Sequence, residues 1–220
     1  RFGPVHNSAV IITADGIVSQ YDKVHLLPFT ERPPGERLFT ALGWIDPYRR
    51  FILSVLGYIG TGVPASEVRL LSIPNRKLPP FWTPLCFELA DARLAREARA
   101  KGARYFLNLT SEGDLGPQIY WNTMAVSVLR AVELHVGLAR CGNMGISCVI
   151  DPWGRLTHQL RGRSGSLWGE SGLLKARVPL GPRTTTVYAR LGDWPAGVAA
   201  LVLLIAAAFA IQERRKLGKA

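Results

Sequence analysis

The stretch PLCFELADARLAREARAKGARYFLNLT, residues 84–110, joins three patterns around one cysteine. A short apolar run predicts a strand that ends near Cys86. Apolar residues then recur among charged ones and predict a helix over residues 89–100, which Gly102 is placed to stop. The run RYFLNLT, residues 104–110, predicts another strand. A strand, a turn, a helix and a strand in this order favour a layered α/β domain.

The rest of the chain continues this alternation. Residues 7–26 predict two strands around the turn ADG, and residues 145–160 predict a strand, a turn and a strand. We also expect a helix over residues 119–138 and a last strand over residues 172–178. The unusually apolar residues 44–58 fit either an arm that dips into a membrane surface or an ordinary packed helix.

The composition restricts the class of partner. The chain has 220 residues and a formal charge of +11, which favours anionic partners unless it only reflects high arginine usage. Zinc-finger spacing, a basic zipper and an aromatic RNA-binding pattern are absent from the sequence, so we expect no nucleic-acid partner. The three cysteines form no CxxC or Cys/His cluster, and we expect no structural metal. The chain starts at Arg1, so we expect a fragment of a longer protein.

The run WPAGVAALVLLIAAAFAI, residues 194–211, predicts a transmembrane helix. It carries no charge, and at about 1.5 Å per residue it spans most of a hydrocarbon core about 30 Å thick. A basic tail, residues 212–220, follows it and indicates a cytoplasmic C-terminus. The alternative is a buried core helix. With this topology residues 1–190 form a domain on the outer face of the membrane, and an export signal or further helices are expected upstream.

Cys86 is a candidate nucleophile because a strand that runs into a turn and a helix presents a thiol to free backbone N–H groups. A thiol with a pKa of about 8.5 needs a nearby cation or base to react well. Lys23 is a candidate for the charge, and Glu31 and Glu88 are candidate carboxylates. The residues alone leave open whether Cys86 is a nucleophile or an inert buried thiol.

Six motifs, in order along nearly the whole chain, resemble the nitrilase or carbon-nitrogen hydrolase superfamily and, within it, bacterial apolipoprotein N-acyltransferases. YDKVHLLPFTERPP resembles the segment with the catalytic lysine, PLCFE the segment with the catalytic cysteine, and LLPFTE is typical of the acyltransferase branch. The other three are NLTSEGDLGP, MAVSVLRAVELHVGLARCGNMGISCVIDPWGRL and TVYARLGDWPAGVAALVLL.

This resemblance implies an α/β fold, a nitrilase-like α/β/β/α sandwich followed by one C-terminal transmembrane helix. It implies that Cys86 is the nucleophile and Lys23 the lysine of a Glu-Lys-Cys triad. Glu31 and Glu88 match supporting glutamates, and Phe87 stands where an aromatic residue, often Tyr, is expected. The triad glutamate would lie upstream of residue 1, so we expect the 220-residue chain alone to be inactive.

The resemblance also implies a reaction, partners and a location. The enzyme would sit in the bacterial inner membrane with its catalytic domain on the periplasmic face. A phospholipid, usually phosphatidylethanolamine, would donate an acyl chain to a cysteine thioester, and the diacylglyceryl-cysteine of a lipoprotein would accept it. We expect a monomer without a cofactor or metal. The loop at residues 110–116 lacks the Trp-Phe pair of relatives, which affects the expected lipid contacts there.

Two other functions remain open at this stage. A membrane-tethered amidase or nitrilase that acts on a small C–N substrate would share Cys86 and Lys23. A degenerate membrane-anchored binding domain would retain the fold without the chemistry. For the remaining polar residues we expect structural roles: His25 and His135 as structural histidines, Arg130 and Glu133 as an ion pair, and Cys141 and Cys148 as buried small hydrophobes.

Overall fold

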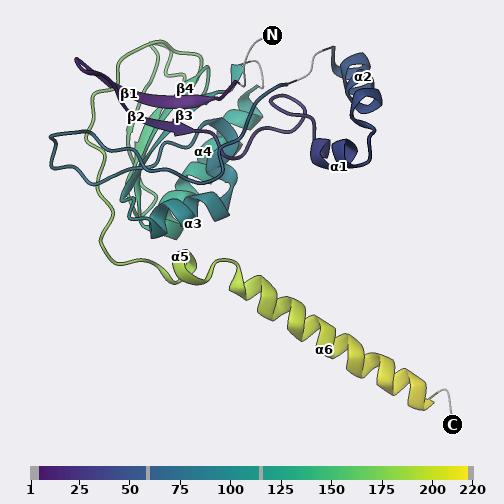
Figure 1. Ribbon diagram of the computed structural model, residues 1–220. Helices are drawn as coiled ribbons and strands as arrows, with labels where there is room; N and C mark the ends of the chain where they lie inside the picture. Colours follow the sequence, from purple (N-terminus) through teal and green to yellow (C-terminus); the bar gives the residue numbers. More distant parts are fainter. Residues whose placement is uncertain (1–4, 58–59, 114–115, 218–220) are drawn as a thin grey trace.

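The computed structural model describes residues 5–57, 60–113 and 116–217, and Figure 1 shows an α/β body from which one long helix projects. Strands β1 (Ser8–Thr13) and β2 (Gly16–Asp22) form an antiparallel ribbon, which confirms the two strands expected over residues 7–26. Gly16 turns the chain between them with φ = 97°, a conformation that costs glycine little. Lys23 follows the last residue of β2 directly.

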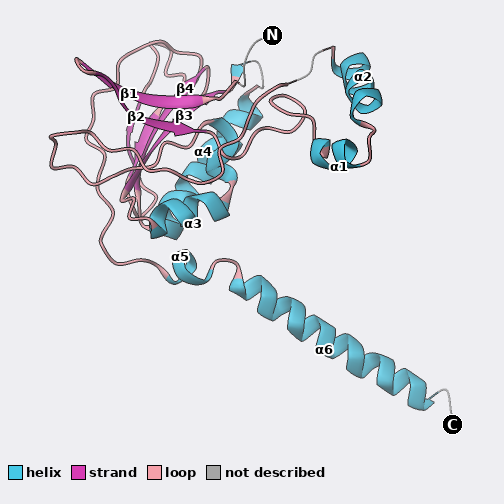
Figure 2. Ribbon diagram, in the orientation of Figure 1, coloured by secondary structure: helices cyan, strands magenta, loops and turns pink. Residues whose placement is uncertain are grey.

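A second, four-stranded sheet carries the core (Figure 2). The order is β3-β4-β5-β6; β3 and β4 are parallel, and the remaining pairs are antiparallel. The strands are β3 (Tyr105–Ser111), β4 (Gly137–Asn143), β5 (Cys148–Ile150) and β6 (Leu156–Gln159). Single bridges join Trp82 to Phe106 and Leu85 to Leu109, so the segment before Cys86 runs parallel to β3.

Seven helices complete the described part of the chain. Their bounds are α1 (Glu36–Ala41), α2 (Ile45–Leu56), the 3₁₀ helix η1 (Cys86–Ala90), α3 (Ala92–Ala100), α4 (Pro117–Leu134), α5 (Val187–Leu191) and α6 (Trp194–Leu217). The buried ring of Trp82 lies edge-on to Tyr21 of β2 at 6.4 Å and to Phe106 of β3 at 5.1 Å between ring centroids. These aromatic contacts tie the ribbon to the large sheet.

Two helices differ from their expected bounds. The helix expected over residues 89–100 is divided, because Asp91 accepts hydrogen bonds from Arg93 N and Leu94 N and so caps α3 separately from η1. The helix expected over residues 119–138 ends at Leu134, and Gly137 already belongs to β4. A Cβ at Gly137 would lie 1.7 Å from Pro179 O, so only glycine fits there.

The strand expected over residues 172–178 is wrong. This segment lies outside every sheet of the described residues, and Leu173 is 91% exposed. An apolar run predicts a strand only where a partner edge is free to pair with it.

The turn at Asp151 is confirmed: its Oδ1 accepts from Trp153 N and Arg155 N between β5 and β6.

The apolar stretch at residues 44–58 forms α2, which is an exposed helix. Phe51 is 61% and Val55 62% exposed, whereas Ile52 is buried. This exposure favours the arm over the ordinary packed helix, although the residues do not decide between them; Tyr58 lies outside the described residues. Helix α1 precedes α2, and the ring of Phe39 stacks on that of Tyr48 at 4.1 Å.

Helix α6 contains the one described span that is long and apolar enough to cross a membrane, Trp194–Ile211, and none of it is buried against the rest of the chain. The buried core helix is therefore the wrong alternative for this run. Residues 1–4 of the expected catalytic domain and residues 218–220 of the expected basic tail lie outside the described part of the chain.

Candidate active site

Cys86 occupies a strained turn at the junction of a strand-like segment and η1. Its φ is 53°, in the left-handed region that a side chain rarely adopts. Glu88 N donates to Leu85 O at 3.2 Å and closes the turn. The Sγ of Cys86 lies 3.9 Å from Ser111 O at the end of β3. The fold therefore holds this thiol at the carboxyl ends of the parallel segments, where α/β sheets present reactive groups.

A buried polar network supports the turn. Asn108 Nδ2 donates to Pro84 O at 2.9 Å and to Cys86 O at 3.4 Å, so one amide holds the backbone on both sides of Leu85. Asn108 Oδ1 accepts from Arg140 Nη1 at 2.9 Å, and Arg140 pairs with the buried Glu112. Sequence reasoning missed this network. The available signal was a pair of polar residues at inward-facing positions of otherwise apolar strands.

Lys23 and Glu31 form a close ion pair. Lys23 is 1% exposed, and its Nζ lies 2.7 Å from Glu31 Oε2. The same oxygen accepts from Leu27 N at 2.6 Å, and Oε1 accepts from Asn7 Nδ2 at 2.8 Å. Burial acts to raise the pKa of Glu31, but the hydrogen bonds from Leu27, Lys23 and Asn7 outweigh it and lower that pKa below its usual value. Glu31 is therefore an ionised partner that holds the Lys23 ammonium.

Glu88 is fully buried and binds the backbone on two sides of the site. Its Oε1 accepts from Val24 N at 2.7 Å and His25 N at 3.0 Å, immediately after Lys23. Its Oε2 accepts from Leu85 N at 2.9 Å, immediately before Cys86. Burial raises the pKa of Glu88, against the opposing effect of these hydrogen bonds. Glu88 thus fixes the segment of Lys23 against the segment of Cys86.

A polar cavity of about 590 Å³ brings three of the expected site residues together. Lys23, Glu31 and Cys86 all line it. The lining also includes Asn7, Ser111, Cys141 and Asn143. Cys141 is exposed, so its expected burial is wrong. It lies in the C-terminal half of β4, which borders this cavity. Sequence reasoning also missed Asn7, because its contact with Glu31 spans 24 positions and has no local signal.

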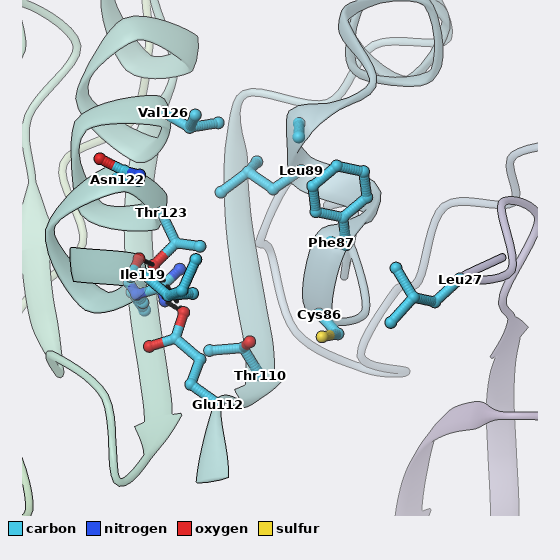
Figure 3. Close-up of a pocket in the computed structure, with 12 residues that line it drawn as sticks. Leu27, Cys86, Phe87, Leu89, Thr110, Glu112, Ile119, Asn122, Thr123 and Val126 are labelled. Atoms are coloured by element: carbon cyan, nitrogen blue, oxygen red, sulfur yellow. Dashed lines mark hydrogen bonds and ion pairs between the residues drawn. The ribbon is translucent and has the colours of Figure 1, made fainter. Parts of the chain in front are cut away.

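An apolar cavity of about 300 Å³ adjoins the other side of Cys86 (Figure 3). Phe87 and Leu27 line it beside the thiol, and Ile119 and Val126 of α4 face them across the space. Phe87 is 47% exposed. Glu112 and Arg140 also line this cavity, at its edge near Thr123. Cys86 therefore lies between a cavity that holds the Lys23–Glu31 pair and a cavity whose exposed wall is mainly apolar.

The structure also tests the residues for which we expected structural roles. His25 Nδ1 lies 2.9 Å from Asp91 Oδ2, and Arg130 pairs with Glu133 as expected. Cys148 is buried as expected, and burial raises the pKa of its thiol to about 11. Within residues 5–57, 60–113 and 116–217, no group of three or more His, Cys, Asp or Glu could hold a metal ion. The altered loop at residues 110–116 is described only in part, since Asp114 and Leu115 lie outside the described residues.

Comparison with known proteins reveals relatives over most of the chain. It is 33% identical over 212 residues to the apolipoprotein N-acyltransferase of Rhodopseudomonas palustris, with 93% of this chain and 35% of that protein covered. It is 29% identical over 204 residues to apolipoprotein N-acyltransferase 2 of Treponema pallidum, with 91% of this chain and 34% of that protein covered. The chain thus spans about a third of the length of these curated relatives.

Among solved structures, the fold is similar to that of Nit3 from Saccharomyces cerevisiae, a member of branch 10 of the nitrilase superfamily. The TM-score is 0.48 and the identity 19%, with 70% of this chain and 49% of that chain covered. The family model for carbon-nitrogen hydrolases matches residues 2–185, which include every residue that lines the two cavities at Cys86. The chain therefore has a nitrilase-like α/β fold and belongs to the carbon-nitrogen hydrolase family.

Proposed function

We propose that this chain is the catalytic part of an apolipoprotein N-acyltransferase, which moves an acyl chain from a phospholipid through a Cys86 thioester to the amino group of a lipoprotein's diacylglyceryl-cysteine. One observation carries the proposal: Cys86 lies between a cavity with the Lys23–Glu31 pair and an apolar cavity. The relatives named above support the same reaction.

In the first half-reaction the Cys86 thiol loses its proton to a carboxylate base. Glu31 is a poor base because three hydrogen-bond donors stabilise its ionised form. We therefore assign the base to the glutamate that the family resemblance places upstream of Arg1. The thiolate then attacks the sn-1 ester carbonyl of the phospholipid, and a C–S bond forms while the carbonyl oxygen becomes an oxyanion.

The Lys23 ammonium and the backbone N–H of Phe87 stabilise this oxyanion. Glu31 keeps Lys23 in place, and the loss of one such donor typically costs about 10² to 10³ in rate. The tetrahedral intermediate collapses when the C–O bond breaks. The glycerol oxygen takes the proton from the base, and a lysophospholipid leaves. The acyl chain on Cys86 lies in the apolar cavity, against Leu27 and Ile119.

In the second half-reaction the neutral amino group of the diacylglyceryl-cysteine attacks the thioester carbonyl. A C–N bond forms, the C–S bond breaks, and the amine proton passes through the base to the Cys86 sulfur. An amide results and the thiol is regenerated. Thiolate is a better leaving group than alkoxide, so the thioester intermediate makes this step easier than direct aminolysis of the ester.

The proposal also gives the chain its place in the cell. Residues 1–190 form the catalytic domain, residues 194–211 cross the inner membrane, and residues 212–220 form a cytoplasmic basic tail. The domain then faces the periplasm as a monomer. Both substrates are lipids that reach the site from the bilayer.

A transfer assay tests the proposal. The complete gene product is purified in mixed micelles with phosphatidylethanolamine, labelled in its sn-1 chain, and a diacylglyceryl-cysteine peptide. We expect label in the N-acyl peptide, and none with Cys86→Ala. The control Cys141→Ala, which changes a second thiol on the wall of the polar cavity, retains transfer. Hydrolysis of small amides without lipid turnover would instead indicate an amidase, and a folded protein with neither activity would indicate a binding domain.

A further inference from the structure

A third cavity, of about 480 Å³, lies between α3 and α5 and shares no lining residue with the two cavities at Cys86. Four arginines dominate its wall. The polar side chains that line it are Arg93, Arg96, Glu97, Arg99, Thr185 and Arg190. We call it the arginine cavity. The reaction at Cys86 gives these guanidinium groups no role.

Carbonyl oxygens, and not carboxylates, satisfy two of these arginines. Arg96 donates from Nη2 to Arg190 O at 3.0 Å and so caps the end of α5. Arg99 is 4% exposed, and its guanidinium donates to four backbone carbonyls. Carbonyls satisfy N–H groups without neutralising their charge. Burial, followed by the neighbouring charge of Arg104, lowers the pKa of Arg99, as expected for a cation without a counter-ion.

Of the two nearby carboxylates, Glu97 pairs with a lysine outside the cavity, and Asp91 is shared between His25 and Arg93. Glu97, on the wall of the cavity, lies 3.0 Å from the Lys101 ammonium. Asp91 lies 2.9 Å from His25 and 3.5 Å from Arg93, which is 76% exposed at its side chain. The Nε of Arg190 donates to the neutral hydroxyl of Thr185 at 2.9 Å. The four arginines therefore outnumber the carboxylates near them, and the arginine cavity keeps an excess of positive charge.

The arginine cavity lies next to the start of the apolar helix, as Figure 1 shows for α3, α5 and α6. Arg190 precedes Trp194 by four residues, a separation of at most about 14 Å along the chain. Helix α5 also exposes Val187 (62%) and Leu191 (60%), which lie one turn apart on one face. An apolar face and a cationic cavity side by side, just before a membrane helix, are typical of the headgroup region.

We propose that the arginine cavity binds the phosphate group of an anionic phospholipid, such as phosphatidylglycerol, in the leaflet at which α6 begins. Guanidinium groups bind phosphate oxygens in pairs, and the excess charge of the cavity favours a ligand with a net negative charge. A zwitterionic headgroup brings its own ammonium next to the arginines, so its binding is weaker. The inference rests on the membrane span of α6 and is independent of the chemistry at Cys86.

Lipid retention tests the proposal. The full chain is reconstituted in nanodiscs with equal amounts of phosphatidylethanolamine and phosphatidylglycerol, and native mass spectrometry counts the lipids that remain bound. We expect phosphatidylglycerol to be retained preferentially. The double variant Arg93→Gln with Arg190→Gln is expected to weaken that retention on the order of 20-fold, since each arginine near a membrane surface contributes about fivefold. These side chains make few internal bonds, so the fold is expected to survive.

The matched control is Arg161→Gln with Arg163→Gln on the loop after β6, which removes the same charge elsewhere and retains phosphatidylglycerol. The proposal is overturned if both double variants lose phosphatidylglycerol equally, or if the native chain retains the two lipids equally. It is also overturned if millimolar glycerol 1-phosphate displaces the lipid. Extraction of membranes with alkaline carbonate separates this proposal from the proposed function. If carbonate releases the chain, α6 does not span the membrane and the proposed function fails too. If the chain stays in the membrane, a failed lipid-retention test counts against the arginine cavity alone.

Discussion

Glu88 lies two residues after Cys86 but lines neither cavity at the thiol. Its carboxyl group instead joins Leu85 N to Val24 N and His25 N, the backbone neighbours of Cys86 and Lys23. A proposed nucleophile and a proposed cation that are 63 residues apart in sequence are thus held together by one buried side chain. Glu88 is in our account a positioning residue.

Glu88→Ala tests this role. The substitution leaves the buried N–H of Leu85 and the partly buried N–H groups of Val24 and His25 without their acceptor, and a buried group of this kind costs about 1–3 kcal/mol. We expect the free energy of unfolding to fall by about 3 kcal/mol or more, together with a loss of thiol reactivity at Cys86. Thermal unfolding and the rate of iodoacetamide labelling measure these effects. The exposed control Glu170→Ala changes neither, and an equal effect of both variants would contradict the role.

Glu31 gives a pH dependence with a defined sign. Its pKa in the folded state lies below the unfolded value of about 4.5, because its hydrogen bonds outweigh the opposing effect of burial. Between the two values the unfolded state binds more protons, so stability falls as the pH falls. The contribution of Glu31 is complete above about pH 4.5 and is lost through the folded pKa.

Melting temperatures at a series of pH values from 7 to 3 check this expectation, compared between the native chain and Glu31→Gln. The native chain is expected to lose its advantage over the variant as the pH falls below about 4.5. A constant difference across the whole range would show that Glu31 does not titrate with a lowered pKa. The amide of the variant retains the size of the side chain, so packing contributes little to the comparison.

At the scale of elements, α2 exposes an apolar surface that no other described part of the chain covers. Phe51 and Val55 lie one turn apart on it and are both more than half exposed. We expect this helix to contact the lipid surface from which the donor is taken. Phe51→Ser with Val55→Ser should then raise the KM for phospholipid about tenfold, since each removes apolar area from that contact.

Turnover kinetics on vesicles measure this effect, and iodoacetamide labelling of Cys86 shows whether the site itself is intact. Ile12→Ser with Ile17→Ser is the matched control, because both side chains are exposed on the β1–β2 ribbon. A similar rise in KM for both double variants would exclude a specific role for α2. A fall in kcat with an unchanged KM would place its effect within the site and not at the lipid surface.

Element patterns predicted most of the strands and helices, and the misses have physical causes. The end of α4 was placed four residues late because apolar residues continue from the helix through Val136 into β4. The strand over residues 172–178 was wrong because pairing depends on a neighbouring edge. Motifs predicted Lys23 and Cys86 as site residues, and the structure brings both to the wall of one cavity. Asn7, Asn108 and Arg140 were missed because their roles come from contacts between distant segments.

At the scale of the whole molecule, α6 projects from the body (Figure 1), and its apolar span Trp194–Ile211 is not buried against the rest of the chain. We expect it to anchor the protein in a bilayer. Leu203→Arg places a charge near the middle of the span, which costs about 2.5–3.5 kcal/mol of insertion. The fraction of protein that resists alkaline carbonate extraction should fall. Leu173→Arg is the control on an exposed loop, and equal behaviour of the two variants would contradict the span.

The central claim is that Cys86 carries the acyl group, and mass spectrometry of its peptide tests this most directly. The complete gene product is incubated with phosphatidylethanolamine without an acceptor and then digested. The account predicts an acyl mass on the Cys86 peptide that hydroxylamine removes, that Lys23→Ala greatly diminishes and that Cys86→Ala abolishes. A folded, membrane-bound protein whose Cys86 remains unmodified in the presence of phospholipid would contradict the account.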